Sequence, residues 1–457
     1  MKPVRPGLHT TQVIFAAILL VHLLFFLSAL INPPVSLTDS TDYLNASQNL
    51  YKQGVLYCGD LSAPIVEEQF TRRPPLYPLL LGITGPARSN IPAFLVQILM
   101  SMISLFLVYT IFFRNQADPD IQKELHKRNR AMLFATLLLL ATPAQFIYAN
   151  RIMAEVPFQL ILVLLTWSVY SYFNKGKDRY IWMFNIFLTL GMATKPVLFP
   201  FAILIVVASV ILFLKTKRSA FVWAIILPIL WIGLYSIWNY NRTGSAQYSS
   251  IQTANMVNYN LRYFLTGEEG KEKAAAEVDR LYMVCGEKTA YREKNNCLDK
   301  GVRELILERP VKYGIFHLKG SVRYFIDPGR FDLVTFFNLS TTGSEGFLHE
   351  LNQNGLPGAY RVLKAQGLGL IFVLGLIVLF KLVKILGFIL YIVRGKQQLP
   401  FRIFLLVLVG YLALVTGPLG ASRFLLPVEL LLLGGAVLGW ISLLKKPGTI
   451  STSVSEV

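Results

Sequence analysis

The sequence predicts an all-α integral membrane protein with about ten transmembrane helices, and two observations lead to this fold class. Of the 457 residues, 54% are hydrophobic and only 15% are charged, and the mean hydropathy is +0.50. This composition is too apolar for a soluble protein of this size and is typical of many membrane spans. Most of the basic residues behind the net charge of +18 lie in short clusters between apolar segments. The positive-inside rule explains such clusters, so the sequence argues against a nucleic-acid partner.

The first half of the chain predicts an N-terminal membrane core at residues 1–238 with seven spans. Lys2 and Arg5 precede the first span, 12–31, and no small-residue cleavage site follows it. We therefore expect an uncleaved helix that leaves the N-terminus in the cytoplasm, followed by an external loop at 32–90. The other six predicted spans of this half are 91–113, 131–148, 156–173, 180–193, 197–214 and 220–238.

Residues 239–359 are the longest polar stretch and predict a small, mainly helical external domain. The helix candidates in it are 270–284 and 297–308. The sequence leaves open whether Cys285 and Cys297 close a disulfide loop there or whether these and Cys58 are three unpaired thiols. Because the chain has no CxxC and no Cys/His cluster, we do not expect a structural zinc site.

The last part of the chain predicts a C-terminal membrane unit at 360–444 and a cytoplasmic tail at 445–457. Its predicted spans are 360–382, 403–415 and 424–444. Segment 384–393 is apolar between basic residues, so it either lies along the inner membrane surface or lengthens the preceding helix, and we favour the surface position. Every predicted inner loop is basic, which leaves both termini in the cytoplasm and the long polar segments outside.

The first external loop carries the most informative polar residues. Asp39 and Asp42 are three residues apart and Tyr43 is four residues from Asp39, so a helix at 39–51 lying on the membrane surface would place them on one side. Further on, Arg72 and Arg73 precede a Pro-Pro pair that we expect to hold the backbone extended. An acidic and a cationic pair in one loop at the membrane boundary indicate a site for a hydroxyl nucleophile and a phosphate leaving group.

Other ionisable residues fall on the same predicted external face, at the ends of spans. They are Arg151, Glu155, Lys195, Arg242 and Arg423. Charged residues at such positions are costly enough to indicate function. Each also has a structural alternative that the sequence leaves open: Asp39 as a helix cap, Glu155 paired with Arg151 at helical spacing, and Lys195 and Arg423 extended toward lipid headgroups.

Several short motifs of this chain resemble those of the polytopic GT-C glycosyltransferases. The resemblance is strongest to the lipid A aminoarabinose transferases and to the dolichyl-phosphate-mannose protein mannosyltransferases. The motifs are Asp39-x-x-x-Tyr43, Arg73-Pro74-Pro75-Leu76-Tyr77, Glu155 at the start of the fourth span, Ala193-Thr194-Lys195-Pro196, Asn241-Arg242-Thr243-Gly244 and Arg423-Phe424-Leu425-Leu426-Pro427. They extend from the first span to the last.

This resemblance implies roles for individual residues. Asp39 is implied as the catalytic carboxylate, Glu155 as the second acidic residue that supports the site, and Arg73 as the contact to the donor phosphate. The remaining candidates for substrate binding are Arg72, Tyr43, Tyr77, Lys195, Arg242 and Arg423. The family often has Asp-Glu where this chain has Asp39-Ser40. No cofactor is therefore assigned, and a divalent cation and the division of work between Asp39 and Asp42 stay open.

The implied reaction is the transfer of a hexose or pentose from a polyprenyl-phosphate donor to a hydroxyl of a glycolipid, glycan or protein. It would take place at the outer face of the cytoplasmic membrane. A carboxylate would take the hydroxyl proton, and we expect the neighbouring Asp42 to raise the pKa of Asp39 toward working pH. Arginines would stabilise the leaving phosphate. With no Rossmann or Walker motif, a nucleotide-sugar donor is disfavoured.

Two other functions fit a multispan protein with an external loop. One is a lipid-linked glycan polymerase, ligase or flippase, which would not need Asp39. The other is a secondary transporter, which would carry polar residues or broken helices at mid-membrane. We rank both behind a transferase because the charges noted above cluster at the outer edge of the predicted spans.

Overall fold

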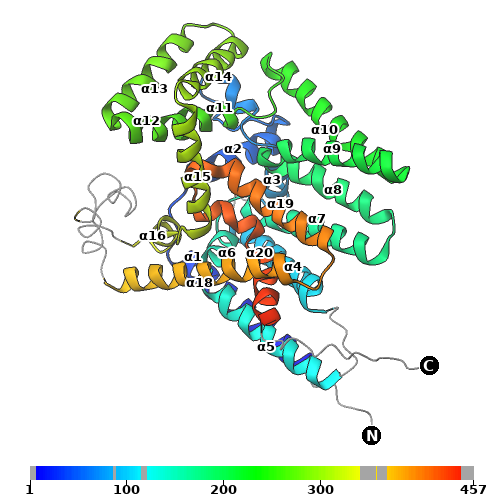
Figure 1. Cartoon of the computed structure of the whole chain (residues 1–457). Helices are drawn as coiled ribbons and strands as arrows, with labels where there is room; N and C mark the ends of the chain where they lie inside the picture. Colours follow the sequence, from blue (N-terminus) through cyan, green and yellow to red (C-terminus); the bar gives the residue numbers. More distant parts are fainter. Residues whose placement is uncertain (1–6, 86–88, 115–120, 340–356, 358–367, 444–457) are drawn as a thin grey trace.

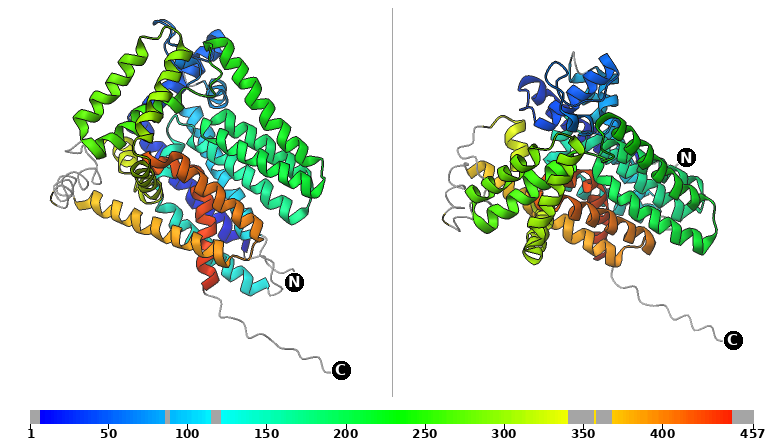
Figure 2. Two further views of the ribbon diagram at one scale, coloured as in Figure 1. Left: turned by 45° about the horizontal axis from the view of Figure 1, so that its top comes forward. Right: turned by 90° about the horizontal axis from the view of Figure 1, so that it is seen from above.

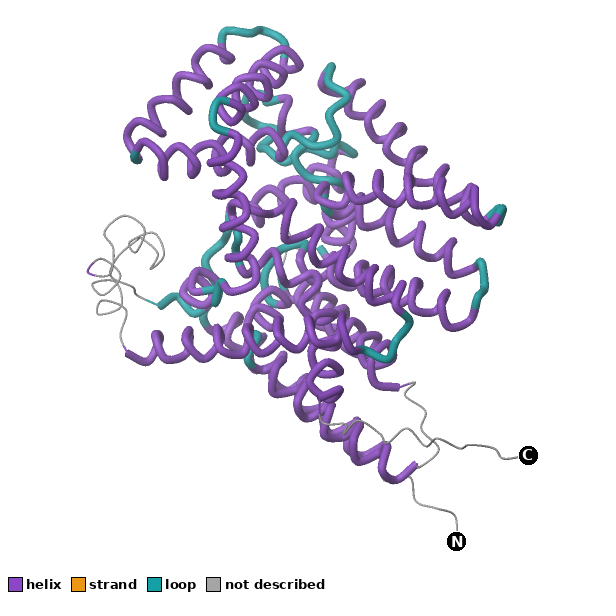
Figure 3. Tube along the Cα trace, viewed as in Figure 1, coloured by secondary structure: helices purple, strands orange, loops and turns teal. Residues whose placement is uncertain are grey.

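The structure is a computed structural model, and it describes residues 7–85, 89–114, 121–339, 357 and 368–443 (Figure 1). Within these ranges the regular elements are all helical and no strand occurs (Figure 3). The α-helices of the first half are α1 (Gly7–Ile31), α2 (Thr38–Gln53), α3 (Leu76–Thr84), α4 (Ile91–Tyr109), α5 (Ile121–Leu140), α6 (Pro143–Ala149), α7 (Glu155–Lys175), α8 (Arg179–Thr194), α9 (Phe199–Thr216) and α10 (Ala220–Thr243).

The second half consists of a group of shorter helices followed by three long apolar ones. These are α11 (Ile251–Asn255), α12 (Arg262–Glu269), α13 (Lys271–Gly286), α14 (Tyr291–Leu307), α15 (Pro310–Ile326), α16 (Arg330–Phe336), α18 (Leu368–Arg394), α19 (Leu399–Thr416) and α20 (Ser422–Leu443). Figure 1 shows α12, α13 and α14 at one end of the molecule, with α5 at the opposite end.

The predicted class, an all-α membrane protein, is confirmed by the helices themselves. In the described part of the chain, eight helices are long and apolar enough to cross a membrane, and nine if α5 and α6, bent by 67° at their junction, form one span. The count of ten is not confirmed. The missing span, 180–193, is α8, whose 16 residues rise only about 24 Å at 1.5 Å per residue, less than the roughly 30 Å of a hydrocarbon core.

Helix α20 forms the centre of the membrane part. Nearly every residue from Leu425 to Gly439 is buried, and α20 lies against α18, α7 and α5. A Cβ on Gly439 would come within 1.8 Å of the backbone oxygen of Gly387 on α18. Glycine is therefore required where the two helix backbones touch, a packing mode common in membranes. The views in Figure 2 show α20 surrounded by other helices.

The position favoured for segment 384–393 is wrong. Helix α18 continues without a break to Arg394, so this segment lengthens the helix. Lys384 does not mark a basic inner surface, because its ammonium group is buried and forms an ion pair with Glu429 of α20. Nothing in the local sequence pattern linked Lys384 to an acidic partner 45 residues away.

Helix α2 confirms the predicted helix at 39–51. Asp42, Tyr43, Ala46 and Ser47 are buried on one side of this helix, whereas Tyr51 is 80% exposed. This face packs against α3. The expected extended Pro-Pro segment is also corrected, because Pro75 has helical dihedral angles of −76° and −23° where α3 begins.

The polar helices α11–α16 have a small core of their own. Val257, Leu261 and Phe264 pack there with Val278 and Leu298 and with further apolar side chains of α13 and α14. The structure settles the open question of the cysteines, since Cys285 and Cys297 form a disulfide between α13 and α14 while Cys58 is free and buried.

We expect the variant Cys285→Ser/Cys297→Ser to be cleaved by trypsin faster than wild type between α13 and α14. The disulfide closes a loop of 12 residues, and loops of about this size stabilise a fold by up to roughly 3 kcal/mol. The measurement is the cleavage rate of protein in detergent, with Cys58→Ser as the control. Equal rates for all three proteins would mean that the disulfide does not stabilise this region.

The topology makes a separate prediction. A single cysteine placed after Trp238 should react with a membrane-impermeant maleimide in intact cells, whereas one placed after Phe173 should react only once the membrane is opened. Labelling of the first site only after lysis would place α11–α16 on the cytoplasmic side and remove the basis for an external site.

Candidate functional site

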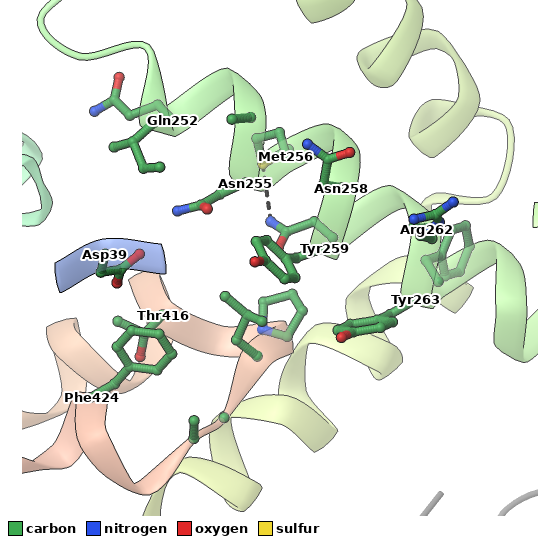
Figure 4. Close-up of a pocket in the computed structure, with 18 of the residues that line it drawn as sticks. Asp39, Gln252, Asn255, Met256, Asn258, Tyr259, Arg262, Tyr263, Thr416 and Phe424 are labelled. Atoms are coloured by element: carbon green, nitrogen blue, oxygen red, sulfur yellow. Dashed lines mark hydrogen bonds between the residues drawn. The ribbon is translucent and has the colours of Figure 1, made fainter. Parts of the chain in front are cut away.

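A cavity of about 3020 Å³ lies between the membrane helices and the polar helices. Its walls come from α2, from α7 and the turn after α8, from α11–α16 and from α18–α20. Seven of the ten residues predicted for the site line it: Asp39, Tyr43, Arg72, Arg73, Glu155, Lys195 and Arg423. Figure 4 shows Asp39 at one side of this cavity, across from α11 and α12.

Two arginines hold the Asp39 carboxylate from different parts of the chain. Arg73 Nη2 donates to Asp39 Oδ1 at 2.6 Å, and Arg423 Nη1 donates to Asp39 Oδ2 at 3.1 Å. Arg73 comes from the segment before α3, and Arg423 is the second residue of α20. The segment between α1 and α4 and the last membrane helix therefore meet at Asp39, although 384 residues separate it from Arg423.

Asp42 accepts hydrogen bonds from Arg72 and Arg73. Its Oδ2 accepts from Arg72 Nε at 2.8 Å and from Arg73 Nη2 at 2.9 Å. Arg73 is 7% exposed and its guanidinium also lies over the ring of Tyr43, 5.0 Å from the centroid. With partners on several sides, Arg73 is held in one orientation with its charge compensated.

Asp39 does not cap the helix, so this structural alternative is wrong. The N-cap of α2 is Leu37, and no side chain caps this helix. The expected rise in pKa is also wrong. Burial raises the pKa of Asp39, but the cations Arg73, Arg423 and Lys195 together outweigh burial and lower it to about 2. The positive charges affect the pKa of Asp39 more than the carboxylate of Asp42 does, because two of the cations contact Asp39 directly.

Glu155 and Lys195 form a second pair at the cavity. Lys195 Nζ donates to Glu155 Oε1 at 2.8 Å, and Glu155 Oε2 is buried with no hydrogen-bond partner among the residues that the structure describes. Glu155 is the first residue of α7, and Lys195 follows the last residue of α8. The alternative pairing of Glu155 with Arg151 is not formed, because Arg151 donates to Thr335 of α16 instead.

Three predicted residues, Asp42, Tyr77 and Arg242, do not line the cavity. Tyr77 is buried and donates to Gln97 Oε1 at 2.7 Å, with its ring against Tyr43. Arg242 donates to the Leu56 carbonyl and to Asn239, and its guanidinium lies 3.6 Å from the centre of the Trp238 ring. In this structure Tyr77 and Asp42 contact the cavity residues Tyr43 and Arg73, and Arg242 links the segment between α1 and α4 to α10.

Comparisons with known proteins give a result only at the level of structure. No protein-family model matches the chain, and no curated protein matches its sequence. Among solved structures, the chain is similar to ArnT from Cupriavidus metallidurans in the apo state and bound to undecaprenyl phosphate. Identity is 14% in both cases, the matches cover 94% of this chain and 77% of ArnT, and the TM-scores are 0.35 and 0.36.

The chain resembles ArnT. At these TM-scores the likeness carries none of the proposals below, which rest on contacts within this chain.

The N-terminus of α20, which carries Arg423, is fixed by two carboxylates that the sequence did not single out. The Ser422 backbone N–H donates to Asp327 Oδ2 at 2.6 Å, and its hydroxyl donates to Asp332 Oδ2 at 2.5 Å. Tyr148 donates to the other oxygen of Asp332 at 2.6 Å. Burial raises the pKa of Asp332, although hydrogen bonds from Ser422 and Tyr148 oppose the rise. These contacts join the end of α15 and helix α16 to Ser422, the residue before Arg423.

Sequence reasoning also missed a polar face on α11–α12 and a buried charge cluster. The polar face consists of Gln252, Asn255, Tyr259, Arg262 and Tyr263, which all line the cavity. The spacing of these residues, three or four apart, was a signal that could have revealed a shared helical face. The charge cluster consists of Lys381, Lys384 and Glu429 inside the apolar helices α18 and α20. Lys384 also donates to Thr142 at the bend between α5 and α6.

No group of three or more His, Cys, Asp and Glu side chains suited to a metal ion occurs in the described ranges. Asp39 and Asp42 are close in sequence, but arginines bind both of them. The two carboxylates are thus arranged to hold cationic side chains in place.

Proposed function

We propose that this protein transfers a sugar from a polyprenyl-phosphate donor to an acceptor hydroxyl, at a site on the outer side of the cytoplasmic membrane. The observation that carries this proposal is Asp39 held between Arg73 and Arg423 at the wall of a large cavity. A carboxylate and two guanidinium groups at one point supply both a proton acceptor and the charge for a leaving phosphate.

The walls of the cavity suit a donor with a lipid tail. On the membrane side they include apolar residues of α7, α18 and α19, among them Phe158, Ile371, Leu374, Val378 and Leu412. Arginine binds phosphate with two parallel hydrogen bonds, which Arg73 and Arg423 can offer at the end of these walls. A phosphate joined to a polyprenyl chain therefore matches both parts of the cavity.

In the proposed reaction the acceptor oxygen attacks the anomeric carbon, and the bond from this carbon to the phosphate oxygen breaks. The electron pair of the broken bond goes to the phosphate, and the acceptor proton goes to Asp39. Asp39 is a weak base while both arginines hold it. A bound phosphate competes for the same N–H groups, and losing them raises the pKa of Asp39. Donor binding thus prepares the base. Glu155 Oε2, which has no partner in the described part of the chain, can accept a hydrogen bond from the sugar.

Replacing Arg73 tests donor binding. We expect Arg73→Ala to retain about 10-fold to 100-fold less co-purified polyprenyl phosphate than wild type, because a charge-assisted hydrogen bond contributes about 1.5–3 kcal/mol. The measurement is mass spectrometry of lipids extracted from purified protein. Arg114→Ala is the control, since Arg114 is exposed and does not line the cavity. Equal lipid content in the two variants would remove Arg73 from the donor site.

A further inference from the structure

The face of α11–α12 that borders the cavity is built unlike the rest of these helices. Its five residues, Gln252, Asn255, Tyr259, Arg262 and Tyr263, are called here the amide–tyrosine face. The opposite side of the same helices carries Val257, Leu261 and Leu265, which pack into the core of the polar helices and do not line the cavity. The tyrosines are therefore not needed for packing, and Tyr259 and Tyr263 are 41% and 47% exposed.

The polar groups of this face are available to a ligand. In the described part of the chain, the side chains of Gln252, Asn255, Tyr259 and Tyr263 make no hydrogen bond to protein. The two tyrosine rings lie side by side, with centroids 6.1 Å apart. Tyr259 is carried on a π-helical segment, Met256–Leu261, and π-turns within helices occur frequently at functional sites.

These groups match the chemistry of a saccharide. A sugar ring presents C–H groups that pack on aromatic rings, and hydroxyls that both donate and accept hydrogen bonds, as the amides of Asn and Gln do. A fatty acyl chain would leave the amides unpaired, which is unfavourable. The mixture of exposed aromatic rings and convergent polar groups in a cavity is typical of a ligand site.

The amide–tyrosine face lines the same cavity as Asp39, and an acceptor has to bind in this cavity for one of its hydroxyls to reach Asp39. Figure 4 shows Tyr259 within the cavity and Asn255 pointing to the side on which Asp39 lies, with Thr416 and Phe424 next to Asp39 on that side. We propose that the acceptor is a saccharide chain, that the amide–tyrosine face binds it, and that one of its hydroxyls is thereby presented to Asp39. This inference rests on the proposed transferase function and adds the class of acceptor to it.

The test is saturation-transfer NMR on protein in nanodiscs, with chitotetraose, cellotetraose and maltotetraose as probes. We expect at least one probe to bind, and Tyr259→Ala/Tyr263→Ala to weaken its binding by about tenfold or more. Tyr259→Phe/Tyr263→Phe should keep most of the binding, because it keeps the rings. Tyr51→Ala, at an exposed tyrosine that does not line the cavity, should have no effect.

The proposal is overturned if no probe binds, if the alanine variant binds as wild type does, or if Tyr51→Ala gives the same loss. A failure of the transferase function has a different signature. In the Asp39→Asn background, saccharide binding should still depend on Tyr259 and Tyr263, whatever the substitution does to transfer. If transfer proves independent of Asp39 while the tyrosines still control saccharide binding, the binding face stands and the proposed reaction fails.

Discussion

Purified Asp39→Asn protein is expected to bind the donor lipid as wild type does and to transfer sugar about 10²–10⁴-fold more slowly, the usual contribution of a positioned general base. Asparagine has nearly the same shape as aspartate and retains an oxygen that accepts from Arg73 or Arg423. Arg73 also keeps its contacts to Asp42. The fold should therefore survive while the proton acceptor is lost.

The measurement is transfer from the co-purified lipid donor, normalised to the amount of folded protein. Asp60→Asn is a matched control, since Asp60 lies in the same segment between α1 and α4, is exposed, and its carboxylate accepts hydrogen bonds from Ser62. A rate close to wild type for Asp39→Asn would make Asp39 structural. Glu155, whose Oε2 is unpaired within the described ranges, would then be the next carboxylate to replace. The same result would favour a polymerase, ligase or flippase, for which Asp39 is not needed.

The second large effect is expected at the buried ion pair of α18 and α20. We expect Lys384→Met alone to destabilise the protein by about 3–5 kcal/mol, because it leaves the Glu429 carboxylate buried without its partner. The double variant Lys384→Met/Glu429→Leu should be close to wild type in stability, since it replaces both charges by apolar groups. The measurement is thermal unfolding in detergent, with ligand-free protein throughout.

The control is Glu277→Gln, which breaks the exposed pair of Glu277 with Arg280 and should not change unfolding measurably. Transfer activity of the double variant decides what the buried pair does. Activity near wild type means that the pair serves packing between helices. A double variant that is stable but inactive would show that charge inside the membrane is required for activity, as it is in a transporter.

Local patterns of the sequence were sufficient for the class of protein and for most of the spans. Apolar runs of about 20 residues and basic inner flanks do not depend on distant contacts, because the membrane itself selects them. In the same way, Asp39, Arg73, Glu155, Lys195 and Arg423 were candidates from their charge at the ends of apolar segments. All five line one cavity.

The tertiary structure alone decided which of these residues touch and what their contacts do to them. Arg423 reaches Asp39 across 384 residues, and its positive charge is one reason that the pKa of Asp39 is lowered instead of raised. Glu429 of α20 neutralises Lys384, and segment 384–393, which was expected on the membrane surface, is part of α18. Periodicity and composition describe one segment at a time, whereas the balance of burial and charge at a side chain depends on whichever segments pack against it.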